Sequence, residues 1–200
     1  MLRVEYKNSR GKVQWGPGAL VLLPMASGDD VYWLAAPNRV LPSCALSFLR
    51  KVTLVGPAGE VTSAASGGIA REWVRRVWCD WDRGFTLVEL TRPAVQAMRA
   101  ARATCRTVAT ATQGMRVTRV YAGGAGALVE TPATIACVAD ETLELTDRIR
   151  SSVLLIGEDG RLLGVTSGYS YSTLYSFEKI VNEFLEDRMW QIRCRPLAYL

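Results

Sequence analysis

Histidine is absent from this sequence of 200 residues. It is the side chain whose ordinary pKa lies nearest to neutral pH, and hydrolases with a Ser-His-Asp triad or a Cys-His pair use it to carry protons. Neither mechanism is available without it. Zinc sites built from cysteine and histidine are excluded in the same way, and the five cysteines form no Cys-x-x-Cys pair. We therefore expect no metal site and no cofactor.

Long apolar runs are also lacking. No run approaches the roughly 18–20 residues that a membrane-spanning helix needs, and residues 1–7 show no apolar signal-peptide core. The cysteines are odd in number and scattered, which favours reduced, buried thiols. These five residues are Cys44, Cys79, Cys105, Cys137 and Cys194. The expected location is cytoplasmic, without a membrane partner.

The composition is that of a folded domain with a positive net charge. Hydrophobic residues make up 49% of the chain and charged residues 22%, which suits one domain or two small lobes. The net charge is +5, and only four of the 24 basic residues are lysines. The planar guanidinium group of arginine carries several N–H donors, which favours ion pairs and interfaces. The positive balance permits nucleic-acid binding, but the arginines form no dense run that argues for it.

Short apolar and β-branched runs, separated by Gly, Pro and Asp turns, predict a mainly β protein. Residues 19–23 and 31–36 form a plausible hairpin around a Gly-Asp turn cluster. The dipeptide Asp159-Gly160 is a strong hairpin signal between two further runs. The other predicted strands include residues 52–55, 85–90, 117–121, 133–138, 152–156 and 162–167.

One amphipathic helix is predicted near the C-terminus. Its apolar stripe has helical spacing and consists of Phe177, Ile180, Val181, Phe184 and Leu185. Ser176 precedes it as an N-cap. The predicted organisation is a first β-barrel lobe at residues 1–93, an Ala/Thr/Arg-rich linker at 94–112, a second β-barrel lobe at 113–171, and the helix with an apolar tail at 172–200.

Three motifs occur in the order found in a known family. Residues 34–38 read Leu-Ala-Ala-Pro-Asn, residues 85–90 read Phe-Thr-Leu-Val-Glu-Leu with Pro93 beyond, and residues 160–168 read Gly-Arg-Leu-Leu-Gly-Val-Thr-Ser-Gly. This order resembles the chymotrypsin-like (trypsin/HtrA-type) serine proteases over residues 13–187. The resemblance implies two six-stranded β-barrel lobes followed by a C-terminal α-helix.

The positions that carry the family's chemistry hold other residues. Asn38 stands where the catalytic histidine is expected, Gly84 falls on or near the aspartate position, and Arg150 replaces the nucleophilic serine. Asp82 lies two residues from Gly84 and could be confused with the family's aspartate. The resemblance therefore implies a degenerate pseudoprotease, a protease fold without proteolysis.

Other residues offer little to rescue catalysis. Ser151 and Ser152 replace the two glycines whose backbone shapes the family's oxyanion hole. Either serine would need a desolvated lysine as its base, but Lys51 is expected near a first-lobe strand and Lys179 on the polar side of the helix. We expect no enzyme activity and no small-molecule substrate.

Candidate binding surfaces come from three segments. In the first, arginines and tryptophans alternate, which is compatible with a strand packed in the core, with a protein interface, or with stacking on nucleic-acid bases. The second aligns with the strand along which the family's substrates pair, and the third belongs to the apolar tail. The candidate residues are Trp73, Arg75, Arg76, Trp78 and Trp81, then Ser167, Gly168 and Tyr169, and finally Trp190 and Arg193.

These observations predict a protein-binding adaptor or regulatory subunit of a larger cytoplasmic complex, since the scaffold keeps its loops and cleft without workable chemistry. The alternative is a nucleic-acid-binding or scaffold component of a defence assembly, for example a CRISPR-associated one, or of a transcription-regulatory assembly. The basic charge and the abundant arginine motivate this alternative.

Overall fold

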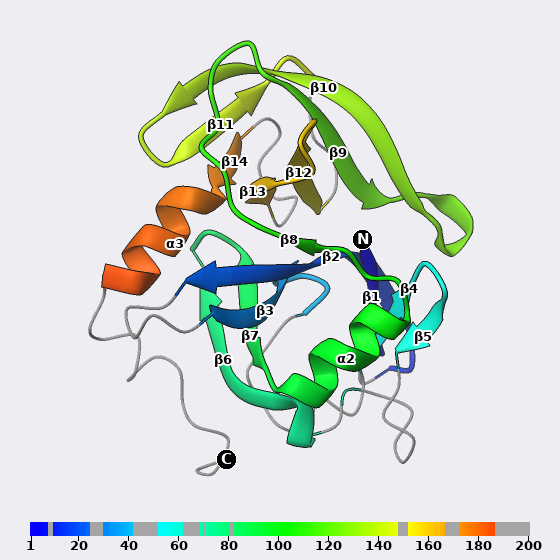
Figure 1. Cartoon of the computed structure of the whole chain (residues 1–200). Coiled ribbons are helices and arrows are strands. Elements are labelled where there is room, and N and C mark those ends of the chain that lie inside the picture. Colours follow the sequence, from blue (N-terminus) through cyan, green and yellow to red (C-terminus); the bar gives the residue numbers. More distant parts are fainter. Residues whose placement is uncertain are drawn as a thin grey trace.

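The computed structural model describes residues 1–7, 10–24, 30–41, 52–61, 69, 71–80, 82–147, 152–166 and 173–186. Within these ranges, mainly antiparallel strands form two lobes that face each other (Figure 1). The C-terminal helix lies at one side of the seam between them.

The first lobe is one sheet in the order β5-β4-β1-β2-β3-β7-β6, with the two-residue strand β8 pairing in parallel with β2. Within the described residues, β5 and β6 are the two edge strands of this sheet, so the described strands form an open sheet and not a closed barrel. The strands are β1 (Leu2–Lys7), β2 (Val13–Pro24), β3 (Asp30–Pro37), β4 (Val52–Gly56), β5 (Gly59–Val61), β6 (Val74–Asp80), β7 (Phe85–Leu90) and β8 (Cys105–Arg106).

Strand β2 joins the two halves of this sheet. Its first residues pair with β1 and its last with β3, in the register Ala19↔Ala35, so the predicted hairpin is confirmed. Gly18 lies where the strand changes partners, and a Cβ there would lie 2.5 Å from Val4 Cγ2. The close approach of β1 therefore requires glycine at this position.

The second lobe is a closed barrel in the order β10-β11-β14-β13-β12-β9. The predicted hairpin at Asp159-Gly160 is confirmed, because β12 and β13 pair on either side of it. The Asp159 carboxylate accepts the Arg161 backbone N–H at 2.9 Å within this turn. The strands are β9 (Arg116–Ala122), β10 (Leu128–Ala139), β11 (Thr142–Leu145), β12 (Val153–Gly157), β13 (Leu162–Thr166) and β14 (Thr173–Ser176).

The segment between the lobes begins as a helix. α2 (Arg92–Ala100) starts with a proline in its first turn, where the missing N–H is harmless. It therefore begins two residues before the predicted linker and occupies its first part. The chain then runs along both lobes: β8 pairs with β2, and the backbone at Thr107 and Ala109 bonds to Leu162 of β13. Short 3-10 turns lie at Arg71–Trp73 and Gly124–Gly126.

The predicted C-terminal helix is α3 (Phe177–Glu186). Ser176 lies at its N-cap position, with its Oγ 3.5 Å from the Lys179 backbone nitrogen. Phe177, Ile180 and Val181 are buried, as the apolar stripe predicts. The helix therefore packs through that stripe onto the strands beneath it.

A third hydrophobic core lies between the cores of the two lobes. It combines strands β2, β3 and β7 of the first lobe with β9, β12 and β13 of the second and with α3. Phe85 of β7 and Phe177 of α3 are both fully buried here, in an edge-to-face pair with ring centroids 6.2 Å apart. Trp78 adds a second such contact to Phe85, at 5.1 Å. The lobes are therefore joined by an apolar core of their own.

Replacing Phe177 with alanine tests this interlobe core. We expect the free energy of unfolding to fall by about 3–5 kcal/mol, because the substitution removes a fully buried ring and leaves a cavity. Urea denaturation followed by tryptophan fluorescence measures the change. Val13→Ala is the control, since Val13 is 48% exposed and its truncation should change stability by less than about 0.5 kcal/mol. Equal effects of the two variants would contradict the interlobe core.

Candidate functional site

Two of the predicted triad positions lie side by side. Pro37 at the end of β3 pairs with Phe85 at the start of β7, so Asn38 and Gly84 are adjacent just beyond this pair. The Asn38 backbone N–H donates to the Gly84 carbonyl oxygen at 2.8 Å. Asn38 is only 7% exposed. The first lobe thus brings together the two residues that the family resemblance assigns to the positions of the histidine and the aspartate.

A tight turn follows Asn38. The Pro37 carbonyl accepts the backbone N–H groups of Val40 and Leu41, at 3.0 and 3.1 Å. The buried Thr86 hydroxyl of β7 donates to the Leu41 carbonyl at 2.8 Å. These bonds fix the Asn38 backbone between β3 and β7.

Gly84 closes the turn between β6 and β7 with a φ of +74°, a left-handed conformation that favours glycine. Its N–H donates to the Asp80 carbonyl at 3.0 Å, and the Asp80 carboxylate accepts the Arg83 N–H at 2.8 Å. This position therefore places backbone, and no carboxylate, beside Asn38. Asp82, the neighbouring acid in the turn, is exposed.

Arg83 in the same turn ties three elements together. Its guanidinium lies 3.1 Å from the Asp80 carboxylate of β6, 2.8 Å from Glu141 at the β10–β11 turn, and 2.7 Å from Glu183 of α3. Burial opposes the charge of this group, but the hydrogen bonds to Glu141 and Asp80 outweigh burial and raise the pKa of Arg83. The bond from Arg83 likewise lowers the pKa of Glu141. The network joins both lobes and α3 around one permanent cation.

A cavity of about 460 Å³ opens beside this network. It lies at the seam of the lobes, and its lining residues are Trp78, Cys79, Asp80, Asp82, Arg83, Glu141 and Tyr175. Three of these lining residues are acidic, and the guanidinium of Arg83, the basic residue among them, is already paired. The cavity therefore presents carboxylates and a thiol, without a base near neutral pH for proton transfer.

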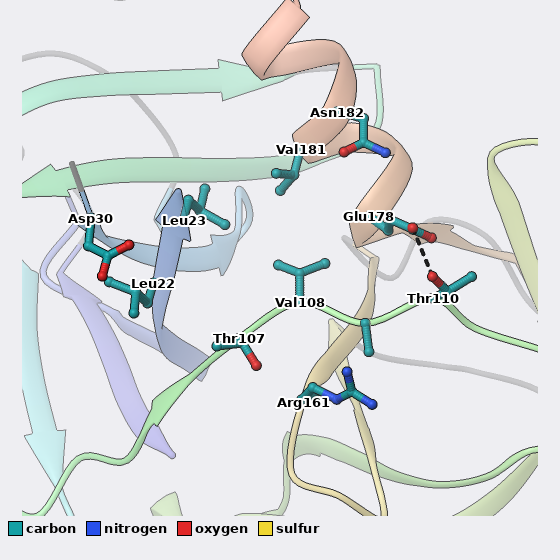
Figure 2. Close-up of a pocket in the computed structure, with 11 residues that line it drawn as sticks. Leu22, Leu23, Asp30, Thr107, Val108, Thr110, Arg161, Glu178, Val181 and Asn182 are labelled. Carbon is teal, nitrogen blue, oxygen red and sulfur yellow. Dashed lines mark hydrogen bonds between the residues drawn. The ribbon is translucent and has the colours of Figure 1, made fainter. Parts of the chain in front are cut away.

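A second cavity, of about 500 Å³, lies between the end of β2, the interlobe segment and α3 (Figure 2). Leu23, Val108 and Val181 supply apolar walls. Thr110 and Glu178 join by a hydrogen bond of 2.8 Å across it. It is lined by residues that hold α3 against the interlobe segment, and it lies apart from Asn38 and Gly84.

The Arg/Trp segment divides between core and surface. Trp73 and Trp78 are buried and pack in the first-lobe and interlobe cores, so neither side chain presents an interface. This removes both from the predicted binding surface, because Trp73, in the 3-10 turn before β6, and Trp78, in β6, both have buried side chains. Arg76 pairs with the buried carboxylate of Glu89 at 2.7 Å. Arg75 remains exposed.

The other predicted site residues lie outside the described residues. These are Arg150, Trp81, Ser167, Gly168, Tyr169, Trp190 and Arg193. Ser152, at the edge of the predicted nucleophile loop, is described and is buried.

Sequence reasoning missed Arg83, Glu141 and Glu183 as one cluster. Arg83 is separated from Glu141 by 58 positions and from Glu183 by 100, so no local pattern relates them. The sequence signal for part of this cluster was the Asp-x-x-Arg spacing before Gly84, which is typical of an ion pair within one turn.

The described ranges contain neither a metal-binding cluster nor a membrane-spanning helix. No three His, Cys, Asp or Glu side chains there are grouped to hold a metal ion. No helix among those residues is long and apolar enough to span a bilayer.

Solved structures with this fold were found, although the sequence matches no protein-family model and no curated protein significantly. Deg5 is 11% identical, with a TM-score of 0.56 over 92% of this chain and 88% of that one. Kallikrein-related peptidase 10 in complex with Zn²⁺ is 15% identical, with a TM-score of 0.51 over 92% and 93%. A mutant of tobacco etch virus protease is 9% identical, with a TM-score of 0.50 over 98% and 81%.

These neighbours have the chymotrypsin-like protease fold. The predicted mainly β fold with a C-terminal helix is therefore confirmed. At such identities the likeness concerns the fold alone.

Arg83→Met tests the ion network through its pH dependence. The pKa of Glu141 is lowered from its ordinary value of 4.5, so its pairing stabilises the fold above about pH 4.5 and is lost as pH falls through the lowered pKa. We expect the variant to be destabilised at pH 7 and the difference from wild type to shrink at pH 3. Urea denaturation at both pH values measures it. A difference that does not change with pH would contradict the ionic contribution.

Proposed function

We propose that this chain is a catalytically inactive member of the chymotrypsin-like fold that binds other proteins, as an adaptor or regulatory subunit of a larger cytoplasmic complex. The observation that carries the proposal is the contact between Asn38 and Gly84. The resemblance to chymotrypsin-like proteases assigns these two residues to the positions of the base and its orienting acid. Neither residue can accept a proton near neutral pH.

The described residues supply no substitute for this chemistry. Ser152 is buried, which keeps its hydroxyl from a substrate. A serine can also be activated by a desolvated lysine, but Lys179 is exposed on α3, where its ammonium is solvated. A protease mechanism would therefore need its base, its acid and its nucleophile from elsewhere in a chain without histidine.

The binding role is supported by the way the fold is held together. The interlobe core and the Arg83 network stabilise both lobes without any catalytic residue. Loops and cavities at the seam therefore remain in fixed positions and can hold a partner without reaction. The nucleic-acid alternative is favoured by the net charge of +5 and by the abundant arginine.

Absence of catalysis is tested with a fluorophosphonate probe and a casein substrate. We expect no covalent labelling and no cleavage by the purified protein, because the chain has no histidine and the described serines, Ser152 and Ser176, are buried. Intact-mass spectrometry detects the label, and a commercial serine protease provides the positive control. A label on Ser151 or Ser152 that denaturation abolishes would refute the pseudoprotease proposal.

The partner class is tested by affinity capture of the tagged protein from cells that produce it, with and without nuclease treatment. We expect a stoichiometric protein partner that survives the nuclease. DNA binding would instead weaken steeply as salt rises, with a slope of about 0.9 per neutralised phosphate in the logarithmic plot. A partner that disappears with nuclease, together with such a slope, would favour the alternative function.

A further inference from the structure

Three arginines from two elements, β6 and α2, line one pocket of the first lobe. The pocket has a volume of about 390 Å³ and lies between α2, β6 and the start of β3. Arg75 comes from β6, and Arg92 and Arg99 come from α2. These elements belong to the same lobe (Figure 1). The cluster is distinct from Asn38, Gly84 and the seam between the lobes.

The helix that carries two of these arginines is firmly seated. Ala94, Val95 and Met98 of α2 are buried in the first-lobe core, so the opposite face is turned outward. Arg92 and Arg99 are seven positions apart, which places them on one side of the helix, two turns apart. The backbone therefore presents both guanidinium groups toward the same pocket.

The charges of this pocket are largely unneutralised. Glu89, the nearest buried acid, is paired with Arg76 at 2.7 Å, whereas Arg75 lies 3.9 Å from it and is 64% exposed. Arg92 makes no hydrogen bond or ion pair with any described residue. Asp30 is the one carboxylate among the described residues that line the pocket.

The third arginine is oriented by an aromatic ring. Arg99 Nη2 donates to the Tyr32 hydroxyl oxygen at 2.8 Å, and its guanidinium carbon lies 5.1 Å from the ring centroid. This neutral partner positions the cation without cancelling its charge. Leu90 and Val95 are buried at the base of the pocket and make it apolar.

We infer that this pocket binds a phosphate monoester carried on a side chain of a partner protein. Three guanidinium groups against one carboxylate leave an excess of two positive charges, which a dianionic phosphate neutralises better than a single carboxylate. The planar guanidinium group of arginine can donate two parallel hydrogen bonds to two oxygens of one phosphate. The apolar base and Tyr32 suit the stem that carries the phosphate, and the volume falls within the range of ligand sites.

This inference deepens the proposed function by naming the chemistry of the partner, and Arg-cluster recognition of phosphorylated peptides is a recurring binding mode. A nucleic-acid backbone is the competing source of phosphate. Its diesters carry one charge each and follow an extended strand, so they match a double positive excess in a single pocket less well.

Phenyl phosphate is the first probe, titrated into nitrogen-15-labelled protein while the arginine Nε–Hε signals are followed by NMR. We expect saturable shifts confined to Arg75, Arg92 and Arg99. Arg92→Glu should weaken binding about tenfold or more, since it removes a charge-assisted contact and adds repulsion. Glutamate in the first turn of a helix is favourable, so the variant should fold.

Arg116→Glu is the matched control, because Arg116 is exposed on β9 of the second lobe and the substitution changes the net charge equally. It should alter phenyl phosphate affinity less than about twofold, well below the effect of losing a charge-assisted hydrogen bond. Thermal unfolding confirms that both variants fold. Equal weakening by the two variants would show attraction to overall charge and overturn the inference, as would the absence of saturable shifts.

Two peptides that differ only in one phosphate distinguish the source of the ligand. The phosphorylated peptide should bind and compete with phenyl phosphate, and the unphosphorylated one should not. A short single-stranded DNA oligonucleotide that binds more tightly and displaces the phosphopeptide would overturn the assignment to a protein partner. Fluorophosphonate labelling would refute the proposed function without affecting this pocket, so the two failures are distinguishable.

Discussion

The packing of Phe85 against Phe177 holds the two lobes in one arrangement. Phe85 is the first residue of β7, next to Gly84, and its backbone pairs with Pro37, next to Asn38. The ring that joins the lobes therefore also sets the place where Asn38 and Gly84 meet. A large side chain buried at the seam fixes the surrounding backbone, because close packing leaves few alternative positions. The geometry of this region thus depends on apolar burial and does not require a catalytic triad.

Arg83 adds an ionic constraint to this apolar one. A single guanidinium pairs with one carboxylate each from β6, the β10–β11 turn and α3, and its positive charge reduces the repulsion among these three carboxylates at the seam. The contribution of each exposed pair is small in water, but a network around a half-buried arginine also restricts orientation. The turn that carries Arg83 needs glycine at residue 84. Gly84 closes this turn and thereby helps to place the interlobe cation.

Features governed by neighbouring residues could be predicted from the sequence, and features governed by distant residues could not. The Asp159-Gly160 hairpin and the apolar stripe of α3 follow from local turn chemistry and helical spacing, and the structure confirms both. The start of α2 was missed because its buried face is short, although Pro93 in the first turn is a known helix-start signal. The pocket formed by Arg75, Arg92 and Arg99 depends on how α2 docks beside β6, which no local pattern specifies. At the candidate site, the family resemblance assigned Asn38 and Gly84 to two triad positions, but the backbone hydrogen bond between them emerged only in three dimensions.

The arginines of this protein separate into two physical classes. Arg83 and Arg76 form ion pairs with carboxylates of the same chain. Their positive charges are therefore largely compensated in the folded state and attract a ligand only weakly. Arg99 instead faces a tyrosine, which directs the guanidinium without neutralising it, and Arg92 faces no described anion. Placing like charges around one pocket costs electrostatic energy in the free protein, and an anion that enters the pocket relieves this cost. A group with two negative charges relieves more of it than a group with one. The same scaffold therefore uses arginine to hold its lobes together at the seam and, in the pocket beside α2, to form the anion site that we propose.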